Sequence, residues 1–98
     1  LHSMQRSAKQ AEALLKQLAN AHRLLLLCHL VSGEKTVGDL TKSIGLSQSS
    51  LSQHLAKLRH AKIVTSDKRG LLVYYRIRST EVQTLLSVLH LIYCRDPN

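Results

Sequence analysis

The sequence contains no phenylalanine and no tryptophan, and it has only three tyrosines and one proline among its 98 residues. A hydrophobic core without large aromatic rings must be aliphatic, and here leucine dominates it. No apolar run approaches the ~18 residues that a transmembrane helix needs, so we expect no membrane contact. A chain of this length forms one small domain, which would gain stability by associating through a helical face.

Cysteine is also scarce, with only Cys28 and Cys94 in the chain. Their spacing excludes the Cys-x-x-Cys pattern of a zinc ribbon or a thioredoxin site. No secretory signal precedes the first amphipathic segment, so we expect a cytoplasmic protein in a reducing compartment. A static structural disulfide is therefore not the default expectation.

The start of the sequence is unusual because Leu1-His2-Ser3 precedes the first methionine, Met4. We expect Met4 to be the native start and residues 1–3 to be a tag remnant. The remainder shows no internal repeat, no low-complexity tract and no proline-rich linker. Residues 4–98 are therefore expected to form a single domain.

Acidic residues are few: six Asp and Glu stand against 14 Lys and Arg, which gives a net charge of +8. Such a charge on a small chain favours a polyanionic partner such as nucleic acid, although a merely soluble basic protein is the alternative. The chain has no nucleophile–base–acid arrangement, no glycine-rich phosphate loop and no set of metal ligands. We therefore expect that it is not an enzyme and carries no cofactor.

Capping residues divide the first two thirds of the chain into helices. An apolar helical face precedes Asn20, which can cap a second helix over residues 21–32 that Gly33 can end. The leucine tract Leu24–Leu27 is expected to anchor this second helix in the core.

The third and fourth helices are predicted by the same kind of signal. Thr36 can cap the third, with Asp39 at the acidic position of a capping box, and Gly45 ends it. Ser47 then caps a fourth helix that runs to about residue 61. The three residues 45–47 leave only a tight turn between these two helices.

Two β-rich segments follow, residues 63–66 and 71–77, and residues 67–70 between them carry a turn signal with two cations. Ser79 or Thr80 then caps a last helix. The predicted order is α-α-α-α-β-β-α, mainly helical with a β-hairpin wing.

Two short helices followed by a basic hairpin are typical of a winged helix-turn-helix, whose second helix can enter the major groove of DNA. Apolar residues of the fourth helix share one stripe that should face the core: Leu51, Leu55 and Leu58. Polar and basic residues elsewhere on this helix or at the hairpin tip are the predicted DNA contacts: Gln48, Ser49, Ser52, Gln53, His54, Lys57, Lys68 and Arg69.

Glutamine can bond N6 and N7 of adenine together, and serine can donate or accept at base edges. Five cations would serve the phosphates instead: Lys57, Arg59, Lys62, Lys68 and Arg69. The alternative interpretation is a solvated polar helix face with no ligand.

Three segments, LANAHRLLLLCHL, TVGDLTKSIGLSQSSLSQHLAKLRHAKIV and VYYRI, resemble the ArsR-type family of small bacterial repressors over residues 11–94. The most specific part is LSQSSLSQHLAKLR. The resemblance implies a nucleoid-associated homodimer joined by the first and last helices. It also implies binding to an inverted-repeat DNA operator and release by a small inducer. The resemblance places base reading at Gln48, Ser49, Ser52 and Gln53, and the wing tip at Lys68, Arg69 and Gly70.

Many proteins of this family sense metals, but two of its metal-site patterns are not met here. The start of the third helix, residues 37–40, has no thiolate, and His90 lacks the acid that follows it in a His-x-x-Glu pair. We therefore expect no metal site. Two alternatives stay open: a dimeric interaction module without a DNA role, and a metal sensor with a non-standard site built from His22, His29, His90 and the two thiols.

The two cysteines and the closing segment LLSVLHLIYC resemble the sulfide-responsive branch of the family. The resemblance implies that Cys28 and Cys94 of one protomer approach each other. Persulfides or other reactive sulfur species, or oxidants, would bridge them and release the DNA. His90 shares a helix face with Cys94 and would favour its thiolate, and Tyr93 would line the pocket. Taken alone, a cysteine in a leucine tract also fits a small buried hydrophobe.

Overall fold

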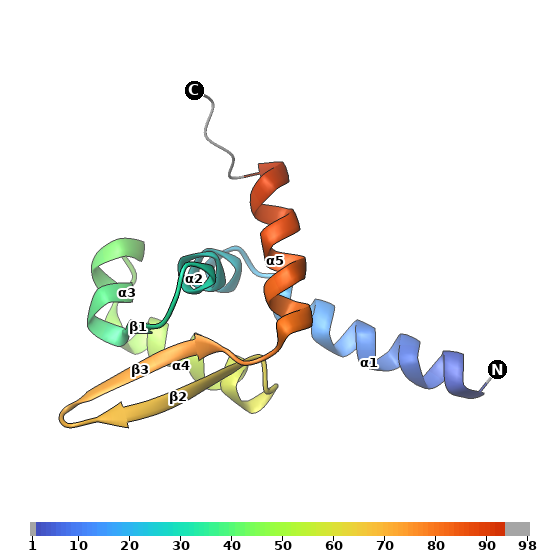
Figure 1. Cartoon of the computed structure of the whole chain (residues 1–98), viewed down its shortest axis with the longest axis horizontal. Helices are drawn as coiled ribbons and strands as arrows, with labels where there is room; N and C mark the ends of the chain where they lie inside the picture. The colour runs from blue at the N-terminus through green and yellow to red at the C-terminus, as the bar shows by residue number, and fades with distance from the viewer. Residues whose placement is uncertain (1, 94–98) are drawn as a thin grey trace.

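The computed structural model describes residues 2–93 and confirms the predicted order of helices and hairpin, with one additional short strand. The elements follow one another as labelled in Figure 1: α1 (His2–Leu18), α2 (Ala21–Val31), β1 (Lys35–Thr36), α3 (Val37–Ile44), α4 (Gln48–His60), β2 (Val64–Arg69), β3 (Leu72–Ile77) and α5 (Thr80–Tyr93). The chain is therefore mainly helical with a β-hairpin wing.

The core is a cluster of aliphatic side chains to which α2 and α4 contribute most of the leucines. The predicted stripe of α4 is buried at Leu51, Leu55 and Leu58. Burying one leucine side chain stabilises a fold by about 1.5–3 kcal/mol relative to leaving it in water. These contacts fix the orientation of α4, so its opposite face is directed to solvent.

The leucine tract of α2 is only partly a core element, which corrects the prediction for Leu24–Leu27. Leu26 and Leu27 are fully buried, but Leu25 is 44% exposed. Four consecutive helical residues spread over roughly 300° of the helix, so they cannot all face one core. The tract therefore presents a mixed surface, and Cys28 lies at its edge.

Helices begin where the capping residues predict. The side chains of Asn20 and Ser47 each accept a backbone N–H from the first turn of the following helix. Thr36 and Asp39 form the reciprocal capping box at the start of α3. Of the two candidates for α5, Ser79 accepts the backbone N–H of the first turn, at 3.1 Å. Local chemistry therefore sets the ends of the helix-turn-helix.

The sheet has three antiparallel strands in the order β1–β3–β2. The two-residue strand β1 was not predicted, and it pairs with Tyr74 and Tyr75 of β3. Two residues are too few to show an alternating pattern in a sequence. Their pairing ties the middle of β3 to the segment between α2 and α3.

The wing hairpin is tighter than predicted. Strand β2 continues to Arg69, which pairs with Leu72, so the loop is Gly70-Leu71 rather than residues 67–70. Gly70 has φ +63° at the first central position, as a two-residue type II′ turn requires. Lys68 and Arg69 are therefore strand residues with alternating orientation.

Figure 1 shows the hairpin and α1 extending in opposite directions from the body of the molecule, with α5 standing beside α2. The Gln83 side chain of α5 donates to the Val31 carbonyl at the end of α2, at 2.9 Å. The nearly buried Arg23 side chain of α2 donates to the Gln17 carbonyl of α1. Among residues 2–93, no helix is long and apolar enough to cross a membrane.

Candidate nucleic-acid interface and thiol site

The exposed polar face of α4 consists of four side chains, which we call the reading face: Gln48, Ser49, Ser52 and Gln53. All four are exposed, and they belong to the first two turns of the helix. The buried leucine stripe on the other side holds these side chains outward. The face can therefore present amide and hydroxyl groups to base edges in a major groove.

His54 and Lys57 are not grouped with the reading face. The His54 ring lies against that of His22 on α2, with 5.8 Å between the ring centroids. Its Nδ1 atom is buried and has no hydrogen-bond partner within the described part of the chain. Lys57 is exposed but borders a separate hollow with Gln17 and Arg23. Their DNA contacts remain predictions, and for His54 the geometry favours packing between helices.

The pKa of His54 lies below its ordinary value of 6.5. The main cause is burial, which disfavours the charged ring, and the nearby Arg23, His22 and Lys57 add electrostatic repulsion. The ring is therefore neutral in the folded protein at neutral pH. A neutral histidine adds no cation to a DNA surface.

Arg69, predicted to contact DNA, is exposed but already bound by other side chains of the protein. Its guanidinium donates to both carboxylate oxygens of Glu34, at 2.7 and 2.8 Å, and to Asp67 at 3.0 Å. It also lies over the ring of Tyr74, 4.6 Å from the centroid. Lys68 beside it is exposed. The structure therefore leaves Lys68 as the accessible cation of the predicted pair.

The bidentate bond also shifts both pKa values. The hydrogen bond from Arg69 lowers the pKa of Glu34, and the bonds to Glu34 and Asp67 raise the pKa of Arg69. Both groups therefore stay charged at neutral pH. Sequence reasoning missed Glu34 because it lies 35 residues from Arg69, and no local pattern links two such positions.

Cys28 is half-buried on α2 and lines a hollow of about 230 Å³ together with Leu25, His29 and His90. The fold thus brings His90 of α5 next to Cys28 of α2, across the contact between these helices. His29, which the sequence suggested only as part of a non-standard metal site, borders the same hollow. Cys28 is therefore only partly shielded from solvent.

Of the other two predicted sensor residues, Tyr93 and Cys94, the structure describes only Tyr93. Tyr93 is 79% exposed and does not line the hollow beside Cys28. Cys94 lies outside the described residues, so its predicted approach to Cys28 stays a prediction. Within residues 2–93, no group of three or more His, Cys, Asp or Glu side chains is placed to hold a metal ion.

Comparison with known proteins gives consistent matches along the chain. A family model described as "Bacterial regulatory protein, arsR family" matches residues 14–66. The "Transcriptional activator HlyU" of Vibrio cholerae is 43% identical over 95 residues, which cover 97% of this chain and 88% of that protein. The "Biofilm growth-associated repressor" of Xylella fastidiosa is 37% identical over 91 residues, covering 93% and 80%.

Solved structures agree with these matches. Reduced HlyU from Vibrio cholerae superposes with a TM-score of 0.92 at 43% identity, covering 97% of this chain and all of that one. The transcriptional repressor BigR from Xylella fastidiosa superposes with a TM-score of 0.86 at 36% identity, covering 97% of each chain. The relatives thus include one described as an activator and one as a repressor.

Proposed function

Because this chain belongs to the ArsR family of bacterial regulatory proteins, it is a DNA-binding transcriptional regulator and not an enzyme, and we propose that reactive sulfur controls it. The reduced protein binds an inverted-repeat operator as a homodimer and represses transcription. Persulfides, polysulfides or oxidants bridge Cys28 to Cys94 and release the DNA. The single observation that carries the DNA role is the exposed reading face of α4 above its buried leucine stripe.

The reading face supports the operator contact by its chemistry. Short uncharged side chains add little non-specific affinity, so their exposure on α4 favours base recognition over general attraction. Non-specific affinity comes from phosphate contacts and from the net charge of +8. Two such helices in a homodimer would meet half-sites about one helical turn, ~34 Å, apart.

Apolar exposure supports the homodimer. In a single chain, several large hydrophobic side chains of α1 and α5 are exposed to water: Met4, Leu15, Val88, Leu91 and Ile92. Exposed apolar surface gathered on particular elements is typical of an interaction site. Covering it with the same helices of a second copy would join two recognition helices at a fixed distance.

The half-buried Cys28 supports the thiol chemistry. A thiolate attacks the sulfane sulfur of a low-molecular-weight persulfide, gains one sulfur and expels the small thiolate. Two cysteine persulfides can then condense to a trisulfide and release hydrogen sulfide, which balances atoms and electrons. A disulfide forms instead when Cys94 attacks the persulfide sulfur bound to Cys28 and expels hydrosulfide. The His90 ring lines the same hollow as Cys28 and is the side chain that we propose assists loss of the thiol proton.

The DNA role is tested by selecting preferred duplexes from a random pool and measuring their affinity by fluorescence anisotropy. Replacing Gln53 by alanine should weaken binding to the preferred duplex by ~1–3 kcal/mol for each half-site, the value of one bidentate base contact, and leave non-specific binding unchanged. The matched control is Gln10→Ala, the same change at an exposed position of α1.

Two results would contradict this account. Selection would yield no preferred sequence, or Gln53→Ala and Gln10→Ala would lower affinity equally. In either case the polar face of α4 would be a solvated surface. The first result would also favour an interaction module without a DNA role.

A further inference from the structure

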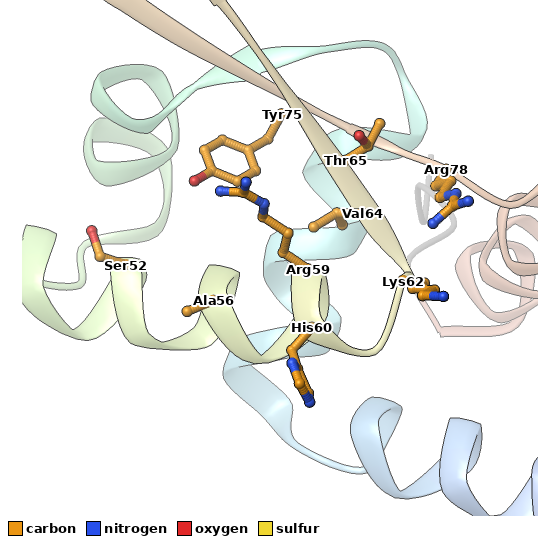
Figure 2. A pocket seen from close by; sticks show the side chains of 9 residues that line it. All are labelled: Ser52, Ala56, Arg59, His60, Lys62, Val64, Thr65, Tyr75 and Arg78. Atoms are coloured by element: carbon orange, nitrogen blue, oxygen red, sulfur yellow. The ribbon is translucent and has the colours of Figure 1, made fainter.

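A hollow of about 570 Å³ lies between α4 and the wing strands, next to the reading face (Figure 2). Ser52 of the reading face forms one end of it. Arg59 of α4 and Tyr75 of β3 line its middle, and Lys62 and Arg78 line the base of the wing. Figure 2 shows that these side chains come from the recognition helix and from both wing strands or their ends. The hollow therefore joins α4 to the wing along one surface.

The charged side chains that line this hollow are all basic. Its lining includes Arg59, Lys62 and Arg78 and no acidic residue. Within residues 2–93, none of these three cations has an ion pair, whereas Arg69 at the wing is bound by Glu34 and Asp67. Uncompensated cations around a concave surface attract an anion more strongly than cations already paired.

The backbone at Lys62 is in a costly conformation. Lys62 has φ +63°, the only non-glycine residue with positive φ within the described chain. It ends α4 in a Schellman arrangement, in which its N–H donates to the Arg59 carbonyl and the Ile63 N–H donates to the Leu58 carbonyl. Glycine is the residue that adopts this position without strain. A lysine here keeps its charge at the hollow at a cost in stability.

The sheet register brings Arg78 to the same place. Val64 at the start of β2 pairs with Ile77 at the end of β3, and the Arg78 N–H donates to the Ile63 carbonyl at 2.9 Å. Arg78 is therefore fixed beside the end of α4, although it lies 16 residues after Lys62 in sequence. Sequence reasoning assigned Arg59 and Lys62 to phosphates in general but did not include Arg78.

We propose that Arg59, Lys62 and Arg78 form a phosphate-binding site for the DNA backbone that flanks the major groove occupied by α4. This proposal rests on the proposed DNA role and adds to it a contact between the protein and the DNA backbone. A helix in the major groove has a phosphate strand along each side, and the space between helix and wing is where one strand would pass. The shared Ser52 makes base reading and phosphate binding continuous along α4.

The test measures the affinity for a preferred duplex against salt concentration for the wild type, Lys62→Gly, Arg78→Gln and a control, Lys9→Gln on α1. Each lost phosphate contact should reduce the slope of log K against log salt by about 0.9. Lys62→Gly should do so while the midpoint of thermal unfolding stays at or above that of the wild type, because glycine relieves the left-handed strain. Lys9→Gln removes the same charge and should leave the slope nearly unchanged.

The outcomes separate this site from the DNA role itself. If the wild type binds DNA but both variants keep its slope, the site is wrong and the proposed function stands. If the wild type binds no duplex, the proposed function fails. The alternative ligand of the hollow is a small free anion. A parallel titration of the DNA-free protein with inorganic phosphate tests this alternative, with the NMR shifts of the Lys62 and Arg78 backbone amides as the readout. Saturation below 1 mM together with unchanged slopes would reassign the hollow to a small anion and overturn the proposal.

Discussion

His54 shows how the fold can replace the role that the sequence predicts for a side chain. It lies on the recognition helix, where a polar residue is expected to face DNA, yet its ring packs near His22 with a buried Nδ1 atom. Burial and the positive groups Arg23, His22 and Lys57 lower its pKa. The residue therefore stabilises the contact of α4 with α2 only in its neutral form.

A pH titration of stability tests this reading of His54. The lowered pKa means that the unfolded chain binds a proton more readily than the fold does. The stabilising effect is thus present above the unfolded pKa of 6.5 and lost as the pH falls through the folded value. Urea unfolding from pH 8 to pH 5 should show a larger loss for the wild type than for His54→Gln. The exposed His60→Gln is the control and should parallel the wild type; parallel curves for all three would refute the interpretation.

At the scale of elements, the wing is fastened to the segment after α2 by an ion pair. Glu34 holds Arg69 at 2.7 Å, and both are partly exposed. An exposed pair of this kind contributes little to folding, because water screens the attraction between its charges. Its larger consequence is for DNA, because it neutralises a wing cation and places a carboxylate on the same face.

Replacing Glu34 by glutamine should therefore strengthen DNA binding. Freeing the Arg69 guanidinium from its bidentate bond to Glu34 for one charge-assisted phosphate contact corresponds to roughly a tenfold gain in affinity for each half-site of the operator. The salt slope should steepen by about 1 for each half-site in parallel. Anisotropy titrations measure both quantities, with Glu12→Gln on α1 as a control of equal charge change. Weaker binding by Glu34→Gln than by the control would instead show that the ion pair holds the wing in its DNA-binding position.

At the scale of the whole molecule, local features were predictable and long-range ones were not. Helix ends at Asn20, Thr36 and Ser47 follow from side chains that bond backbone groups three residues away, so the sequence pattern contains them. The Glu34–Arg69 pair and the hollow that Cys28 shares with His90 bring together residues far apart in the chain. Such contacts depend on packing and register, which no short motif specifies.

The same long-range packing places the thiol where it can influence the whole protein. Cys28 and His90 border a hollow between α2 and α5, and Gln83 holds α5 on the last carbonyl of α2. The segment that follows α2 carries Glu34, which holds the wing. We therefore expect a sulfur bridge to Cys94 to shift α5 against α2 and change the separation of the two recognition helices in the dimer.

The most direct measurement is mass spectrometry of protein that has just released its DNA after treatment with inorganic polysulfide. Trypsin should yield the peptides 24–35 and 79–95, and a thiol switch requires that they are recovered as one covalent species joined through Cys28 and Cys94 with sulfur inserted. Dimers mixed from unlabelled and ¹⁵N-labelled chains should show that both peptides come from one protomer. Release of DNA while both cysteines still react with iodoacetamide would contradict the thiol switch.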